Sequence, residues 1–230
     1  KIMPPEIQQL MDTGTVVFHG EAEETWNQAL IDIVRGEQQP LYRGGQPNLE
    51  QAPLPEFPSG YFDGFVTRIR TADAGRGCPF TCSFCSIINV QGRKMRARSA
   101  QAIIAMVLED CQTYGYASFF ITDDNFARHP YWREILDGLM ALRQQGHKIG
   151  FMIEADLACG KIPDFLEKLA AAGCTQIFMG VESMNPDNLA AATKVQNKVS
   201  EHAELWARCH RLGIAIHAAY IVGFPFDTPD

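Results

Sequence analysis

Three cysteines lie close together, in a C-x3-C-x2-C spacing at positions 78, 82 and 85. Thiolates are the usual protein ligands of iron–sulfur clusters, which generally take four of them. Three thiolates would leave one iron of a [4Fe-4S] cluster open to a small chelating molecule. Structural zinc instead requires a closed tetrahedral set, and no paired C-x2-C or histidine knuckle follows at the usual spacing. The spacing of Cys78, Cys82 and Cys85 therefore favours an iron–sulfur site over a zinc site.

The other four cysteines, Cys111, Cys159, Cys174 and Cys209, are scattered along the chain. An odd total of seven, with three clustered, is typical of a metal site in a reducing compartment such as the cytoplasm, and not of a disulfide framework. Isolated cysteines are most often small buried hydrophobes, and we expect burial here.

The composition is that of an ordinary globular protein, because 46% of the 230 residues are hydrophobic and 20% are charged. The net charge of −7 argues against a general nucleic-acid surface. The longest apolar stretches, such as 117–121 and 218–222, are too short to span a bilayer, so no transmembrane segment is expected. The basic run at 93–98 is expected to be a solvated loop, with a grip on an anion or a substrate as the alternative.

Strand-like and helix-like segments alternate after residue 62, which predicts a parallel α/β sheet or barrel. The predicted strands are 65–71, 118–122, 149–153, 176–181 and 214–222. The predicted helices are 100–114, 131–145, 163–172, 186–192 and 200–212. Five strands with no sixth indicate a barrel truncated after its fifth strand, and hence an excerpt of a longer protein.

The N-terminal residues indicate a separate region. An apolar run at 16–19 predicts a strand, and apolar residues at helical spacing from Trp26 predict a helix that stops near Gly36. These elements cannot close a core alone, so we interpret residues 1–37 as the C-terminal remnant of a preceding domain. Residues 38–62 are rich in Pro, Gly and Gln and predict an extended linker, which leaves 63–230 for the barrel.

Each predicted strand ends in polar or glycine-rich sequence. These patches are 75–78, 123–125, 154–156, 182–183 and 223–225. Active sites of parallel barrels lie at the C-terminal ends of the strands, so we expect the five patches to converge on one barrel mouth.

The cysteine motif, with Phe84 as the aromatic residue before its third cysteine, resembles the signature of the radical SAM superfamily. The resemblance implies a partial (β/α) barrel of TIM type in which Cys78, Cys82 and Cys85 hold a [4Fe-4S] cluster, with Phe84 beside the cofactor. It also implies that the amino and carboxylate groups of S-adenosylmethionine chelate the open iron. Reductive cleavage of this cofactor would give a 5′-deoxyadenosyl radical, with an electron donor such as flavodoxin or ferredoxin as a partner.

Further segments resemble cofactor-binding segments of the same superfamily. Asp123 and Asp124 are similar to the second-strand residues that meet the methionine amino group, although a surface turn or helix cap would also explain them. Glu182 and Ser183 are similar to the fourth-strand residues that contact the ribose or carboxylate. The alternative for this pair is a polar lead-in to a helix capped by Asn185.

The fifth-strand segment is similar to the segment that surrounds the adenine, with Ile221 beside the ring and Gly223 admitting it closely. The fuller pattern of the superfamily has Gly at the position of Ala219 and Glu at that of Phe226, and this chain departs from it at both.

From about Thr15 onward the chain most resembles the cobalamin-binding branch of the superfamily, which includes hopanoid C-methylases. The resemblance implies that residues 1–37 are the end of a Rossmann-like cobalamin-binding domain. It further implies methylation of an unactivated carbon in a small-molecule or lipid-like substrate. The D-x-H-x-x-G loop that would bring a cobalt ligand does not occur in these residues.

Two alternatives remain open. The first is a radical SAM enzyme that catalyses a cyclisation, a rearrangement or a methylthiolation without transferring a methyl group from cobalamin. The second is a non-catalytic metal-binding module. No catalytic residue is assigned; Glu154, Asp156 and Cys159 could meet a substrate, but loop solvation of the acids and burial of the thiol are the simpler expectation.

Overall fold

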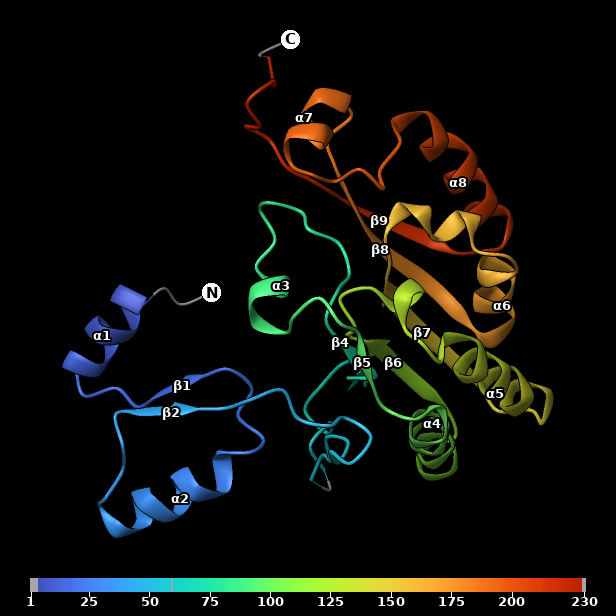
Figure 1. The fold of residues 1–230 in the computed structure, drawn as a ribbon. Coiled ribbons are helices and arrows are strands. Elements are labelled where there is room, and N and C mark those ends of the chain that lie inside the picture. The colour runs from blue at the N-terminus through green and yellow to red at the C-terminus, as the bar shows by residue number, and fades with distance from the viewer. Residues whose placement is uncertain (1–3, 59, 229–230) are drawn as a thin grey trace.

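The body of the protein is a five-stranded sheet in which every strand runs parallel to its neighbour (Figure 1). The computed structural model describes residues 4–58 and 60–228. The strands lie in the sheet in their chain order: β3 (Arg70–Ala72), β6 (Ala117–Ile121), β7 (Ile149–Glu154), β8 (Cys174–Glu182) and β9 (Ala215–Tyr220). Parallel strands joined in order by helices form part of a (β/α) barrel, which confirms the expected α/β class.

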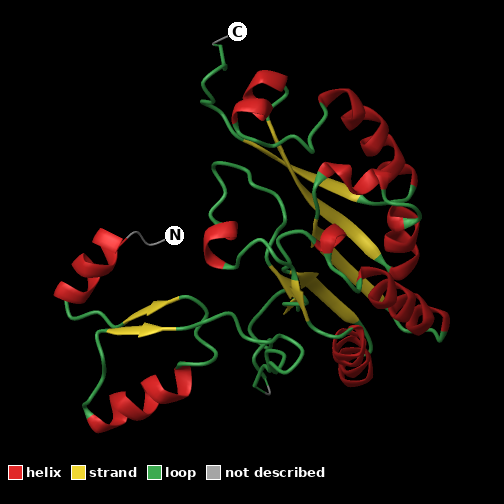
Figure 2. Cartoon of the chain, in the orientation of Figure 1, coloured by secondary structure: helices red, strands yellow, loops and turns green. Residues whose placement is uncertain are grey.

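Helices connect the strands, and all of them except the short helix Pro186–Ala191, which lies past the end of β8, run along the outer face of the sheet (Figures 1 and 2). They are α4 (Ala100–Tyr114), α5 (Trp132–Gln144), α6 (Phe165–Ala172), α7 (Pro186–Ala191) and α8 (Val199–Arg211). All five predicted helices are confirmed, with ends that differ by at most two residues. The limits of α4 follow from its caps: the Ser99 hydroxyl accepts a 3.2 Å bond from the N–H of Ala102, and Gly115 closes the helix.

The hydrophobic core lies between the sheet and these helices. Burial alternates along β6 and β7, so that every second side chain faces the helices. The rings of Phe119 and Phe151 stack across the two strands with centroids 5.1 Å apart. Ile135 and Leu139 of α5 are completely buried against this layer. Apolar packing therefore fixes the strands whose ends form the barrel mouth.

The first strand is shorter than predicted from the sequence. β3 begins at Arg70, so the predicted strand 65–71 is wrong over its first five residues. The N–H of Phe65 instead closes a turn on the Phe62 carbonyl at 3.0 Å. Arg68 stacks its guanidinium 3.4 Å from the centroid of the Tyr114 ring. Aromatic contacts thus replace sheet pairing in this segment.

The N-terminal residues form a small unit beside the sheet (Figure 1). Its elements are α1 (Pro4–Asp12), β1 (Val17–His19), α2 (Trp26–Arg35) and β2 (Leu41–Arg43). β1 and β2 are parallel, and α2 connects them, so the unit is a β-α-β arrangement of the type found in Rossmann-like domains. β2 lies inside residues 38–62, for which the composition predicts a linker.

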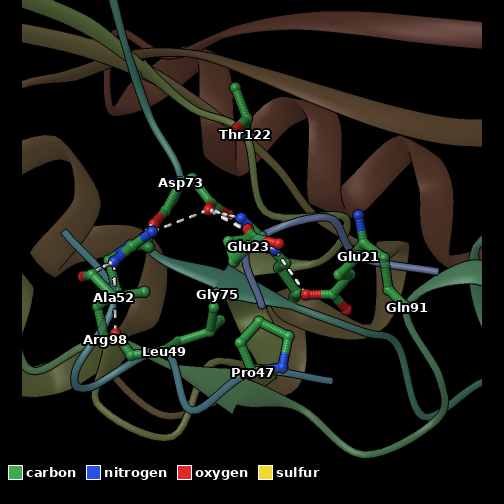
Figure 3. Close-up of polar contacts among 12 residues, drawn as sticks. Glu21, Glu23, Pro47, Leu49, Ala52, Asp73, Gly75, Gln91, Arg98 and Thr122 are labelled. Carbon is green, nitrogen blue, oxygen red and sulfur yellow. Dashed lines mark hydrogen bonds and ion pairs between the residues drawn. The ribbon is translucent and has the colours of Figure 1, made fainter. Parts of the chain in front are cut away.

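A two-stranded antiparallel hairpin, β4 (Gly75–Arg76) with β5 (Arg96–Ala97), interrupts the barrel after β3. Its second strand carries Arg96 of the basic run, and the expectation of a solvated loop is wrong for Arg96 and Arg98, whereas Arg93 and Lys94 are exposed before the strand. Arg98 is only 3% exposed and donates hydrogen bonds to the carbonyls of Leu49 and Ala52 (Figure 3). The run anchors the segment around Leu49 to the barrel because its guanidinium groups satisfy buried carbonyls.

Three short helical segments complete the fold: α3 (Ile87–Val90), η1 (Phe126–Arg128) and η2 (Leu157–Lys161). Within the described residues no helix is long and apolar enough to pass through a bilayer.

Candidate functional site

The cysteine loop begins where β4 ends, and backbone contacts hold its start in place. Gly77 has a φ of 100°, and a Cβ there would lie 2.6 Å from the Lys94 carbonyl oxygen, so only glycine fits. Its N–H donates to the Gln91 side-chain oxygen at 3.0 Å. The N–H of Cys78 donates to the Gly92 carbonyl at 3.2 Å. The hairpin therefore fixes the position of the first thiol.

The other end of the loop is held by the segment that follows α7. The N–H of Ser83 donates to the Ala192 carbonyl at 3.0 Å, and the hydroxyl of Thr193 donates to the Thr81 carbonyl at 2.5 Å. These contacts join residues more than 100 positions apart, since the separation from Thr81 to Thr193 is 112. The loop is thus positioned by two distant parts of the chain.

The loop forms one wall of a cavity of about 370 Å³ at the barrel mouth. The other walls come from the ends of β6, β7 and β8. Its lining includes many of the residues singled out in the sequence: Cys78, Cys82, Phe84, Cys85, Asp124, Glu154, Asp156 and Glu182. The predicted convergence of the patches is therefore found for four of the five strands.

Two of the carboxylates that line this cavity, those of Asp124 and Glu154, form no ion pair with a described residue. Burial raises the pKa of Asp124, and its Oδ2 atom is buried without a hydrogen-bond partner among the described residues. Burial, and then the charge of Asp124, raises the pKa of Glu154. No hydrogen bond or ion pair joins the side chain of Glu154 to another described residue, although its backbone is paired with Phe178 of β8. The pair therefore concentrates negative charge on one side of the cavity, where a cationic group would be stabilised.

A buried ion pair also lines the cavity. Lys194 donates to Glu182 across a Nζ–Oε1 distance of 2.5 Å, and the two residues are 8% and 7% exposed. Glu182 has a φ of 64° next to a register shift in β8, a strained conformation for a residue with a side chain. The ammonium of Lys194 also lies 5.5 Å from the Phe84 ring centroid. Sequence reasoning missed Lys194, because nothing in its local sequence marks it as a site residue.

Asp123, predicted beside Asp124, does not line the cavity. Its side chain is fully buried under β4, and Oδ1 accepts a 2.7 Å bond from the Gly75 N–H. Burial raises the pKa of Asp123 well above its usual range and lowers that of the neighbouring His129. Asp123 supports the hairpin, and its predicted cofactor contact stays a prediction.

Asp156 lines the cavity but is already bonded to other residues. Arg128 contacts both carboxylate oxygens, at 2.8 Å and 2.9 Å. The side chain of Asn125 donates to Asp156 at 3.0 Å, and Asp156 also caps η2 through the N–H of Ala158. The expectation of loop solvation is wrong for Asp156, because its carboxylate organises the exit of β7.

The remaining predicted cofactor residues lie off the cavity. Ser183 is fully buried, and its hydroxyl accepts bonds from Asn185 and Asn188 at the start of α7. Asn185 caps α7, as the alternative from the sequence proposed. Ile221 and Gly223 follow β9 and are not among the lining residues. Their predicted contacts with a cofactor stay predictions.

The four scattered cysteines are buried, as expected. Burial raises the pKa of Cys159 strongly and that of Cys174 to about 12, so both remain thiols at neutral pH. All seven cysteines are unpaired. Within the described ranges, no three His, Cys, Asp or Glu side chains are grouped so that they could hold a single metal ion.

The donor set of the loop fits an iron–sulfur cluster. Cys78, Cys82 and Cys85 share one cavity wall, and the pKa of Cys78 is raised by burial and by the two neighbouring thiols. Positive charge on iron would favour the thiolate form of all three side chains. The unpartnered buried oxygens of Asp124 and Gln196 lie among the lining of the same cavity, where donors on a bound molecule would satisfy them.

Comparisons with known proteins agree with this geometry. Residues 74–230 match the radical SAM superfamily. The bacteriochlorophyllide d C-12(1)-methyltransferase of Chlorobaculum tepidum is 28% identical over 93% of this chain and 47% of its own length. The hopanoid C-2 methylase of Rhodopseudomonas palustris is 31% identical over 67% of this chain and 30% of its own length. The chain therefore spans less than half the length of these relatives.

A solved structure has a similar fold. The cobalamin-dependent S-adenosylmethionine radical enzyme OxsB, with aqua-cobalamin bound, aligns with 95% of this chain and 35% of its own, with a TM-score of 0.68 and 20% identity. Because the superfamily match covers the cysteine loop and all strands from β4 onward, the chain belongs to the radical SAM superfamily.

Proposed function

We propose that this chain is the radical-generating part of a cobalamin-dependent C-methyltransferase. The observation that carries the proposal is the convergence of three thiols, two unpaired carboxylates and a buried Lys–Glu pair on one cavity. Thiolates suit iron, while the charged groups suit a zwitterionic cofactor. When bound, the cluster supplies the electron that cleaves S-adenosylmethionine to methionine and a 5′-deoxyadenosyl radical.

The side chains of the cavity have complementary roles in this proposal. Asp124 and Glu154 accept hydrogen bonds from the amino group of S-adenosylmethionine, since neither carboxylate has a cationic partner among the described residues. Lys194 attracts the carboxylate of the same molecule. Glu182 then accepts hydrogen bonds from ribose hydroxyls. Phe84, 43% exposed at the cavity, covers the bound cofactor and excludes water.

Cobalamin dependence is proposed from the N-terminal unit and the relatives. The β1–α2–β2 arrangement is Rossmann-like, and we interpret it as the end of a cobalamin-binding domain. Both relatives carry methyltransferase or methylase names, one of which refers to a bacteriochlorophyllide and the other to a hopanoid. We therefore propose a lipid-like small molecule as the substrate and a flavodoxin or ferredoxin as the electron donor. We also propose a cytoplasmic location, because seven unpaired cysteines are typical of proteins in a reducing compartment.

Anaerobic reconstitution of the 230-residue chain with iron and sulfide tests the proposal. We expect about four irons per chain and cleavage of S-adenosylmethionine that depends on a reductant. Changing Cys78, Cys82 and Cys85 together to Ser should abolish both while the far-UV circular dichroism is kept. The matched control is Cys174→Ser, a buried cysteine away from the cavity, which should keep both. Binding of zinc without iron, and no cleavage, would contradict the proposal.

A further inference from the structure

Two side-chain amides lie against sulfur atoms of the cysteine loop. Asn125 directs its Nδ2 to the Sγ of Cys78 at 3.9 Å. Gln196 directs its Nε2 to the Sγ of Cys82 at 3.5 Å. Within the part of the chain that the structure describes, no side chain donates to Cys85. The three thiols are thus chemically unequal, although they belong to one motif.

The amide of Asn125 is held in a fixed orientation. Its side chain is 2% exposed, and Nδ2 donates to Asp156 at 3.0 Å. The backbone N–H of Asp156 in turn donates to Oδ1 of Asn125 at 3.3 Å. An amide nitrogen carries two hydrogens. One is therefore used by Asp156 and the second is free for the sulfur of Cys78.

The amide of Gln196 is placed by the loop between α7 and α8. Contacts from Ala192 and Thr193 to the cysteine loop fix this segment beside Cys82. The Oε1 atom of Gln196 is buried without a partner. A thiolate accepts hydrogen bonds and repels a carbonyl oxygen, so the nitrogen is the end that faces the sulfur.

Hydrogen bonds to the sulfur atoms are one of the factors that set the reduction potential of an iron–sulfur cluster. Each N–H dipole stabilises negative charge on sulfur. The reduced cluster carries one more electron than the oxidised cluster, so the bonds favour reduction. Loss of a bond should therefore make the potential more negative.

We propose that Asn125 and Gln196 are positioning residues, which raise the reduction potential of the cluster by donating hydrogen bonds to its thiolate ligands. This inference rests on the proposed function. The shorter contact makes Gln196 the stronger of the two. The two donors come from the exits of β6 and of α7, so the packing of these loops onto the cysteine loop determines how readily the cluster is reduced.

The test is a potentiometric titration of the reconstituted 230-residue chain, followed by the electron paramagnetic resonance signal of the reduced cluster. Gln196→Met keeps the side-chain length and removes the donor, so its potential should shift to a more negative value. Asn125→Ala should give a smaller shift in the same direction. Gln46→Met is the matched control, because Gln46 is exposed and contacts the Gln91 carbonyl instead of a sulfur.

The outcomes separate this inference from the proposed function. An unchanged potential in Gln196→Met with full iron content overturns the inference and leaves the proposed function intact. A wild-type chain that takes up no iron overturns both. If Gln196→Met itself loses iron, Asn125→Ala decides: a negative shift supports the inference, and an unchanged potential overturns it.

Discussion

The five-stranded sheet and the N-terminal unit are stabilised in different ways. In the sheet, large side chains such as Phe119 and Ile153 are at most 1% exposed. In the N-terminal unit, α2 leaves Trp26 50% and Val34 88% exposed. Burial of apolar surface is the dominant favourable contribution to folding. The sheet therefore has its own core, whereas the N-terminal unit depends more on its contacts with the rest of the chain.

Charged groups form much of the contact between the two regions. Glu21 is 8% exposed and pairs with Arg76 at 2.5 Å and with Arg96. Glu23 reaches Arg76 as well, and Asp73 bonds the same guanidinium from the barrel side (Figure 3). Because Arg76 and Arg96 belong to the two strands of the hairpin, these ion pairs attach the N-terminal unit to the strand that leads into the cysteine loop.

The largest expected effect is on the apolar core of the sheet. Phe119→Ala removes a ring that stacks on Phe151 and should lower the free energy of unfolding by about 3–5 kcal/mol. Val34→Ala in the N-terminal unit is the matched control and should change it by less than about 0.5 kcal/mol. Urea unfolding followed by circular dichroism measures both. Equal effects of the two substitutions would refute the idea that the sheet has its own apolar core and the N-terminal unit does not.

A smaller effect is expected at the ion pairs. Glu21→Gln leaves the guanidinium groups of Arg76 and Arg96 partly buried with less compensating charge. We expect the free energy of unfolding to fall by about 3 kcal/mol. The loss should be confined to the contact between the regions. Hydrogen exchange should therefore accelerate in β1, β2 and the hairpin but not in β7.

Glu24→Gln is the matched control for this substitution, because Glu24 is exposed and makes no ion pair with a described residue. If Glu24→Gln accelerates exchange as much as Glu21→Gln does, the network around Glu21 does not hold the two regions together.

The regular parts of the fold could be predicted because their signals are local. α4 has the limits expected from the sequence, since apolar periodicity, Ser99 and Gly115 all lie within the segment. The cysteine motif is local too, and its spacing indicated the chemistry of the cavity. The Asp124 and Glu182 side chains reached that cavity because strand ends of a parallel barrel share one side.

The parts of the site that could not be predicted depend on contacts between residues far apart in the sequence. Lys194 and Gln196 line the cavity only because the segment after α7 docks on the cysteine loop. Asp123 and Ser183 share motifs with lining residues, yet packing turns their side chains toward Gly75 and α7. Successive side chains at the end of a strand point to opposite sides, so only one residue of each neighbouring pair can face the cavity. The sequence pattern does not indicate which of the two it is.

The smallest expected effect lies at the barrel mouth, where the sheet departs from apolar packing. Burial and Asp124 raise the pKa of Glu154, so the folded state binds a proton at this group more tightly than the unfolded state does. The contribution of Glu154 to stability is then fullest below the unfolded pKa of about 4.3 and is lost as the pH rises through the folded pKa. Glu154→Gln removes this loss and should stabilise the chain without ligands by about 0.5–1 kcal/mol at pH 8. The gain should vanish near pH 4, which thermal unfolding across this range can measure.

Glu201→Gln is the control, because Lys161 lowers the pKa of that exposed carboxylate and no stabilisation should follow. A wild-type chain that is more stable than Glu154→Gln at pH 8 would mean that the Glu154 carboxylate is favourably solvated. The barrel mouth would then not be a part of the sheet that lowers the free energy of unfolding.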